Sequence, residues 1–238
     1  PNNVWDANFL GVWHGNDSSG TNVVDSTVNN KTGTKASSTQ PAPLSSGSIA
    51  GAQTYTQGSS RVGTTINNSL GDFSVEVWFK DDGIATGYER LADKSYSNCF
   101  WLGRNNANSN SWGGGIKETS DPYGVFVTLT DNAWHQIATI RSGTTHYMYG
   151  DGGSVSANNT VSSALCDSTN FGIGGYGDGS TNSQWFGGII DEVRLSSVAR
   201  SKAWIAASYK SGKDESNSFG SAENQYQTTG SLTSNIFD

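Results

Sequence analysis

The sequence predicts an all-β fold, a two-sheet antiparallel β-sandwich or jelly roll with one short helix near its C-terminal end. Segments rich in β-branched and aromatic residues recur along the chain, bounded by Gly, Asn, Asp and Ser. One of them, FSVEVWFK, alternates with a period of two, as strands in two-layer structures do. A chain of 238 residues with strands at this density favours one sandwich domain over a barrel.

Ten segments fit the strand pattern, and FSVEVWFK at 73–80 is the clearest. Its odd-numbered residues, Phe73 to Phe79, fall on one face and its even-numbered residues, Ser74 to Lys80, on the other. This division predicts a half-buried strand. The ten segments are 10–15, 73–80, 89–95, 98–104, 111–118, 123–129, 134–141, 145–152, 171–176 and 188–196.

The only helical pattern is SKAWIAASYKSG at 201–212. Ile205 and Tyr209 are four residues apart and therefore fall on one side of a helix. Ser201 is suited to cap the start of this helix, and Gly212 is suited to end it.

The chain divides into one jelly-roll domain at 1–212 and a polar tail or linker at 213–238, in which Ser231–Phe237 has the pattern of an edge strand. Within the domain, residues 17–69 are dense in Ser, Thr, Asn and Gly, and SSTQPAPLSSGS at 37–48 is expected to be loop. No internal repeat is visible.

The composition excludes several classes of partner. Charged residues make up 15% of the chain, against about 25% in a typical soluble domain, and the net charge is −7. Nucleic acids and anionic membranes are not expected as partners, because neutralising phosphates requires clustered Lys and Arg. No run of 18 apolar residues exists, so we expect no membrane insertion.

Low charge with abundant uncharged polar residues is common among secreted proteins, and we expect a secreted or cell-surface location. The first residues do not form a signal peptide, so the chain is expected to be a mature protein or a piece of a longer one. Cys99 and Cys166 are either one disulfide or two buried free thiols. Neither a CxxC pattern nor a His-rich cluster indicates zinc or iron.

Several phrases, in order along the chain, resemble one family. They are LGVWHGNDSSGTNVVDSTVNNKTGT, FSVEVWFK, NAWHQIATIR, MYGDG and GIIDEVRLSSVARSKAWIAASY, and the resemblance covers roughly residues 3–210. These phrases resemble the laminin-G-like, concanavalin-A-like lectin and glucanase jelly-roll domains of bacterial secreted proteins. The resemblance implies the fold, but the superfamily includes lectins, carbohydrate-binding modules, glucanases, lyases and adhesion modules, so the site must decide the function.

Two adjacent acids, Asp191 and Glu192, stand in the last strand-like segment. On a regular strand their side chains point to opposite faces. Glu192 is expected to form an ion pair, with Arg194 two residues on, or with Lys80 or Arg90 across strands.

No catalytic residues are predicted. Retaining glucanases need two carboxyl groups about 5–5.5 Å apart, which alternate residues of one strand supply. The ExDxxE pattern of the glucanases in this superfamily is absent, and Asp191 and Glu192 are adjacent. The lyase motifs of the superfamily are also not reproduced, so His135 is interpreted as a structural residue.

A structural calcium ion is the one cofactor we expect. Calcium takes six to eight oxygen ligands, and Asp- and Asn-rich loops supply them. Glucanases of the resembled family keep a calcium beside an Asp of the closing strand, which implies Asp191 as a ligand. The alternative for Asp17 and Asp25 is a role as turn residues. The predicted ligands are Asp17, Asp25, Asn30 and Asp191.

Sugar-binding sites combine aromatic faces with polar side chains that hydrogen-bond hydroxyl groups, and two loop-rich segments at 88–112 and 174–188 contain both. Phe100 and Leu102 are expected to face the core, which leaves Trp101 on the other surface. The alternative is that these aromatic residues pack beneath loops. The predicted ligand-binding residues are Tyr88, Arg90, Trp101, Arg104, Asn105, Trp112, Tyr176, Asp178 and Trp185.

Three functions remain at this stage. The favoured hypothesis is a non-catalytic, lectin-like module of a larger secreted or surface protein that binds a polysaccharide or other glycan. The second is an adhesion module that binds a surface protein or other copies of itself, through an edge strand in the tail. The third is a polysaccharide hydrolase or lyase.

Overall fold

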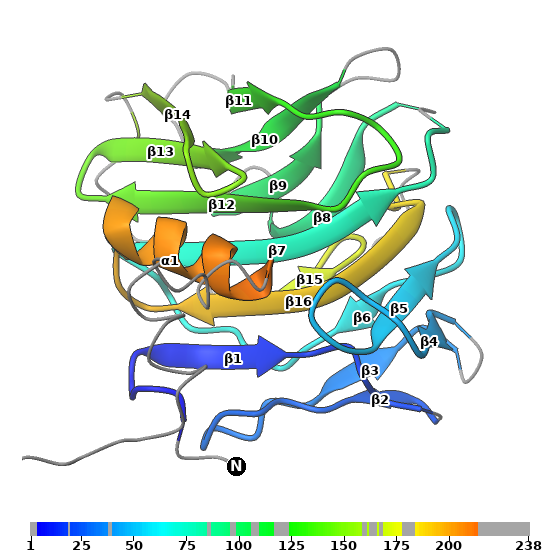
Figure 1. The fold of residues 1–238 in the computed structure, drawn as a ribbon. Coiled ribbons are helices and arrows are strands. Elements are labelled where there is room, and N and C mark those ends of the chain that lie inside the picture. The colour runs from blue at the N-terminus through cyan, green and yellow to red at the C-terminus, as the bar shows by residue number, and fades with distance from the viewer. Residues whose placement is uncertain are drawn as a thin grey trace, which may run out of the picture.

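Two antiparallel β-sheets packed face to face form the body of the computed structural model (Figure 1). The arrangement is a β-sandwich, as the strand pattern predicts. The structure describes residues 4–18, 20–37, 40–84, 87–95, 99–105, 110–116, 124–158, 161, 166, 169–177 and 184–213.

The first sheet, called sheet A, has the strand order β14-β13-β12-β7-β16-β5-β4, and β1 also pairs with β16. The first and last strands of the domain are therefore neighbours. The strands of sheet A are β1 (Phe9–Trp13), β4 (Ala42–Leu44), β5 (Ala52–Tyr55), β7 (Phe73–Asp81), β12 (His135–Ser142), β13 (Thr145–Gly150), β14 (Ser154–Asn158) and β16 (Gly188–Ser196).

The second sheet, called sheet B, has the order β11-β10-β9-β8-β15-β6-β3-β2. Its central strands β8, β9 and β10 pair in sequence order. The strands of sheet B are β2 (Asn22–Val23), β3 (Gly33–Lys35), β6 (Val62–Gly63), β8 (Glu89–Lys94), β9 (Phe100–Arg104), β10 (Ser111–Ile116), β11 (Val125–Thr128) and β15 (Gly172–Ile173).

The main hydrophobic core lies between the sheets. Val75, Val77 and Phe79 of β7 belong to it, together with Phe100 and Leu102 of β9, and each is at most 1% exposed. Burying each such side chain contributes roughly 1.5–3 kcal/mol. The period-two pattern of β7 is thus confirmed on its apolar face.

The other face of β7 is also buried, which differs from the half-buried strand expected. The helix α1 (Lys202–Gly212) packs across this outer face of sheet A, and Figure 1 shows it there in orange. The Trp78 ring of β7 stacks on the Tyr209 ring with centroids 5.5 Å apart. A local pattern cannot reveal this cover, because it comes from a segment more than a hundred residues away.

The helix has the bounds and cap that the sequence predicts. Ser201 is its N-cap, and the Ser201 side chain accepts a hydrogen bond from the backbone N–H of Trp204. Ile205 is fully buried in a small cluster with Ala138, Ile140 and Tyr149 on the outer face of sheet A. No helix in the part of the chain that the structure describes is long and apolar enough to cross a membrane.

Residues 17–69 contain more strand than the sequence indicates. Five short strands, β2 to β6, lie there, and β4 falls inside the 37–48 segment expected to be loop. The central residue of β4, Pro43, cannot donate a ladder hydrogen bond, but β4 is at the edge of sheet A, where proline is tolerated. The predicted tail at 213–238, including Ser231–Phe237, lies outside the described residues except for Lys213.

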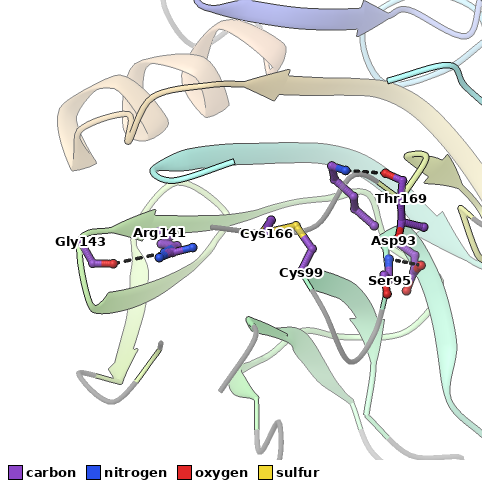
Figure 2. The surroundings of a disulfide bond; sticks show 8 residues. Asp93, Ser95, Cys99, Arg141, Gly143, Cys166 and Thr169 are labelled. Carbon is purple, nitrogen blue, oxygen red and sulfur yellow. Dashed lines mark hydrogen bonds between the residues drawn. A yellow bond between two sulfur atoms is a disulfide. The ribbon is translucent and has the colours of Figure 1, made fainter. Parts of the chain in front are cut away.

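Cys99 and Cys166 form a disulfide, which resolves the two alternatives left by the sequence (Figure 2). Both residues are buried, and the bond joins the start of β9 to a segment 67 residues later. The Lys94 ammonium donates a hydrogen bond to the carbonyl of Thr169, a residue that Figure 2 shows near the disulfide. The two contacts hold the segment before β15 against β8 and β9.

Candidate ligand-binding cleft

A buried polar network lies between the outer face of sheet A and α1. The carboxylate of Glu76, which is 3% exposed, accepts three hydrogen bonds there. The donors are Trp204 Nε1 at 3.2 Å, Gln136 Nε2 at 3.1 Å and Ser208 Oγ at 2.5 Å. Burying a carboxylate is costly unless it is paired, and these donors from β12 and α1 offset much of that cost.

Arg194 connects Glu76 to the second acid of the network. The register of β16 on β7 places Arg194 opposite Glu76, with Nη1 3.8 Å from the Glu76 carboxylate. Arg194 also donates to Glu192 Oε1 at 2.5 Å and to Ser208 Oγ at 2.7 Å. The predicted ion pair between Glu192 and Arg194 is therefore confirmed.

His14 extends the network toward the surface. Its Nδ1 lies 2.6 Å from Glu192 Oε2, and its side chain is 31% exposed. The hydrogen bond with Glu192 raises the pKa of His14 above its ordinary value. Burial by itself would raise the pKa of Glu192, but the hydrogen bond with His14 and the charge of Arg194 outweigh burial and lower it. The contact is thus a charged pair at mildly acidic pH.

The two adjacent acids, Asp191 and Glu192, lie at a register shift in β16. The pairing of β16 with β7 shifts between Ile190 and Val193, and both of these residues belong to the core. The expectation of opposite faces assumed a regular strand, and this irregularity interrupts the alternation at Asp191 and Glu192. Glu192 joins the network beneath α1, whereas Asp191 Oδ2 accepts a hydrogen bond from the backbone N–H of Ile49 at 2.7 Å.

A cleft of about 380 Å³ opens beside this network, between the first residues of the chain and α1. Trp204 is 37% exposed and Trp5 is half-buried, and the Phe9 ring lies between them, with centroids 6.1 Å from Trp204 and 5.0 Å from Trp5. The Arg194 guanidinium lies 5.1 Å from the centre of the Trp5 ring. The lining residues are Val4, Trp5, Asp6, Phe9, Arg194, Trp204, Ala207, Ser208 and Ser211.

The cleft therefore offers aromatic faces together with a guanidinium, a carboxylate and two hydroxyl groups. That combination suits a ligand with both C–H surface and hydroxyl groups. No pattern in the sequence predicted the cleft. One signal was available for Trp204, because the neighbouring Ile205 defines the buried side of α1 and leaves Trp204 near the solvent.

Four of the predicted ligand-binding residues are buried: Arg90, Trp101, Arg104 and Trp112. Trp101 does lie on the face opposite Phe100 and Leu102, but it is only 3% exposed. The Arg90 guanidinium covers its ring at 4.2 Å, and the Phe126 ring lies 5.9 Å away. Little of Trp101 or Arg90 is left for a ligand to contact.

Trp112 and Arg104 are buried for a related reason. Trp112 packs in the main core against Phe79, with ring centroids 4.5 Å apart, and the Arg104 guanidinium stacks on its ring at 4.4 Å. Arg104 forms ion pairs with Asp81, Glu89 and Asp131. Burial raises the pKa of Glu89 to about 7, even though the Arg104 charge acts to lower it.

The other predicted binding residues lie nearer the surface. Tyr88 is 47% exposed, and Asn105, Tyr176 and Trp185 are half-buried. Asp178 lies outside the described residues. An isolated bridge between Trp185 and Arg90 brings the second loop-rich segment beside β8. None of the four described residues, Tyr88, Asn105, Tyr176 and Trp185, lines the cleft beside α1.

The predicted calcium ligands do not form one set. The Asp25 carboxylate accepts hydrogen bonds from the backbone N–H groups of Val12, Thr27 and Lys31 and from the Thr27 hydroxyl. These donors occupy the positions that a metal would need, and they indicate a turn-organising role. Among the described residues, no group of three or more His, Cys, Asp or Glu side chains is placed to hold a metal ion.

The remaining predicted ligands are also engaged separately. Asp17 accepts a hydrogen bond from the backbone N–H of Val24 at 3.2 Å. Asn30 occupies a left-handed position with φ 51°. Asp191 contacts the loop that contains Ile49, and burial raises the pKa of Asp191. Asp25 is therefore fully engaged as a turn residue, whereas Asp191 Oδ1 has no hydrogen-bond partner among the described residues. The calcium site as a whole stays a prediction.

The fold and sequence agree with a known family. A family model described as the concanavalin A-like lectin/glucanases superfamily matches residues 50–206. A search of curated proteins finds no match.

Many solved structures share the fold. The binding domain of paraclostridial mosquitocidal protein 1 is 13% identical with a TM-score of 0.66, and the match covers 86% of this chain and 52% of that one. A Trypanosoma rangeli sialidase in complex with sialic acid is 12% identical with a TM-score of 0.62, and the match covers 87% of this chain and 33% of the sialidase. The binding domain of botulinum neurotoxin DC in complex with SialylT is 12% identical with a TM-score of 0.60. That match covers 86% of this chain and 51% of the toxin domain.

The chain thus spans about half of the two toxin domains and a third of the sialidase. Identities this low establish the shared fold alone.

The arrangement of Asp25 predicts that the domain does not depend on calcium. The thermal unfolding temperature should be the same in EDTA and in excess calcium, because backbone donors already satisfy Asp25. Asp25→Ala should lower the stability by about 2 kcal/mol or more in both conditions, since it leaves buried donors without an acceptor. A fall in Tm on chelation of the wild-type protein, absent in Asp191→Ala, would show that the calcium hypothesis is correct after all.

The pair formed by His14 and Glu192 predicts a pH-dependent stability. The raised pKa of His14 contributes stability that is full below its ordinary value of 6.5 and is lost as pH rises through the folded pKa. The lowered pKa of Glu192 contributes stability above its ordinary value of 4.5 and loses it as pH falls. His14→Gln should therefore cost more stability at about pH 5.5 than at about pH 9, measured by urea unfolding. Equal losses at both pH values would contradict the charged pair.

Proposed function

The chain belongs to the concanavalin A-like lectin/glucanases superfamily, and on that premise we propose that it is a non-catalytic glycan-binding module. The single observation that carries the proposal is the cleft beside α1. Its partly exposed Trp5 and Trp204 rings offer stacking surfaces for sugar C–H groups, and Arg194, Asp6 and Ser211 offer hydrogen bonds to hydroxyl groups.

The size of the cleft supports this function. A volume of about 380 Å³ falls within the range of small-ligand pockets, which is roughly 300–1,000 Å³. The Trp204 ring is held by its hydrogen bond to Glu76 and by the Arg200 guanidinium, whose Cζ lies 4.6 Å from the ring centre. A ring that is already fixed loses little conformational entropy when a ligand stacks on it.

The structural neighbours support the same class of ligand. Two of them are complexes, one with sialic acid and one with SialylT, and two are toxin binding domains. By analogy of fold, this chain is proposed to present a glycan-binding surface within a longer secreted or cell-surface protein. The disulfide between Cys99 and Cys166 supports an oxidising compartment such as the cell exterior.

The state of the acids favours binding over hydrolysis. Glu76 and Glu192 are 3% and 2% exposed, and Arg194 contacts both. A glycosidase needs an acid and a nucleophile or base that reach the glycosidic bond. Here both carboxylates serve the network that positions Trp204 and Arg194, so we assign them no catalytic role.

Substitution of the cleft tryptophans tests the proposal. A glycan array first identifies a ligand for the wild-type protein, and affinities are then measured by titration calorimetry. We expect Trp204→Ala and Trp5→Ala each to weaken binding roughly tenfold or more, equivalent to about 1.4 kcal/mol, through loss of a stacking face. Thermal unfolding followed by circular dichroism shows whether a variant loses affinity only because it is unfolded.

Tyr88→Ala is the matched control, because Tyr88 is exposed and lies outside the cleft. Its affinity should equal that of the wild type. If Tyr88→Ala loses binding and folded Trp204→Ala keeps it, the glycan binds at the loops that the sequence predicted and the cleft is not the site. Absence of any glycan ligand would refute the function itself.

A further inference from the structure

A second depression lies on the other side of the first turn of α1. This groove has a volume of about 310 Å³ and lies between α1 and the strands β12 and β13. Two tyrosines, two serines and two basic residues provide its polar groups. They are Ser142, Tyr147, Tyr149, Arg200, Ser201 and Lys202.

The groove differs in charge from the rest of the molecule. The chain carries a net charge of −7, yet the described residues that line the groove include two cations and no carboxylate. Arg200 is balanced by a bidentate contact with Asp6 at 2.8 and 2.9 Å. Lys202 is exposed and forms no ion pair with any residue that the structure describes. The groove therefore has an uncompensated positive charge.

Tyr149 offers a free hydroxyl group to the groove. The residue as a whole is 6% exposed and lines the groove, and its hydroxyl has no hydrogen-bond partner within the described part of the chain. The hydroxyl is not enclosed by protein, so a ligand in the groove can reach it. Burial raises the pKa of Tyr149, which keeps its hydroxyl protonated as a donor. Tyr147 stacks beside it, with ring centroids 6.5 Å apart.

The start of α1 adds to the positive potential. The helix has 11 residues, and its first backbone N–H groups carry the positive end of the helix dipole. Ser201 satisfies the N–H groups of Trp204 and Ile205. The preceding N–H groups, of Lys202 and Ala203, belong to the first turn, where helical N–H groups have no partner within the helix.

Arg200 joins the groove to the cleft. Its guanidinium lines the groove and stacks on two aromatic rings of the cleft, at 4.3 Å from the centre of the Phe9 ring and 4.6 Å from that of Trp204. One layer of side chain thus separates the two depressions.

We propose that this groove binds the anionic group of an acidic sugar, a carboxylate or a sulfate, in a glycan whose neighbouring unit stacks in the Trp5 and Trp204 cleft. Lys202 provides the charge, and the hydroxyl groups of Tyr147 and Tyr149 donate hydrogen bonds to the anion. The inference rests on the proposed glycan-binding function and adds selectivity for acidic over neutral glycans.

Matched oligosaccharides test the proposal. Affinities are measured by titration calorimetry for lactose, 3′-sialyllactose and 3′-sulfolactose, which share a core and differ in the anionic group. The wild-type protein should bind one or both acidic sugars about tenfold more tightly than lactose, equivalent to about 1.4 kcal/mol. Comparing 3′-sialyllactose, which carries a carboxylate, with 3′-sulfolactose, which carries a sulfate, identifies the anion that the groove accepts.

Single substitutions then test whether the groove residues cause the preference for acidic over neutral sugars. Lys202→Gln and Tyr149→Phe should each reduce the preference for the acidic sugar about fivefold and leave the affinity for lactose unchanged. Lys210→Gln is the matched control, because Lys210 is exposed on the same helix, beyond the lining of the groove. Its preference should equal that of the wild type.

The possible failures are distinguishable. Equal binding of acidic and neutral sugars by the wild-type protein, or equal selectivity of Lys202→Gln and Lys210→Gln, would overturn the inference and leave the glycan-binding function standing. If neither these sugars nor any glycan of the array binds, the proposed function fails and the inference fails with it.

Discussion

The buried ion pair between Arg194 and the two glutamates beneath α1 is the interaction on which the binding surface depends. One guanidinium bridges Glu192 of its own strand and Glu76 of the neighbouring strand, and Ser208 ties it to the helix. Removing charges from water costs several kcal/mol per ion, so each partner is needed to offset the burial of the others. The result is that sheet A and α1 are held in one arrangement, and with them the Trp204 ring.

The same network explains why the cleft and the groove lie where they do. Because α1 is fixed across sheet A, its first turn stands between two depressions, and Arg200 and Trp204 stack to form the wall between them. Aromatic surface lies on one side and uncompensated positive charge on the other. A fold that many unrelated functions share thus gains a specific surface from the helix that covers its outer face.

The sequence predicted those features that depend on near neighbours. The alternation of β7, the cap at Ser201 and the pair of Glu192 with Arg194 all involve residues within a few positions, and the structure confirms them. The burial of Trp101 was not predictable in this way, since its cover comes from Arg90 and Phe126 on other strands. The cleft combines Trp5 and Trp204 from opposite ends of the domain, which no local pattern brings together.

The central claim is that a glycan contacts the Trp5 and Trp204 rings, and NMR observes those rings directly. Each tryptophan contributes one indole N–H signal, assigned by single substitution to phenylalanine, and the eight signals are followed while the glycan is added. The account predicts that the signals of Trp5 and Trp204 shift with one common Kd while those of the buried Trp101 and Trp112 stay in place. A titration that moves the signal of Trp185 and leaves Trp5 and Trp204 unchanged would contradict it.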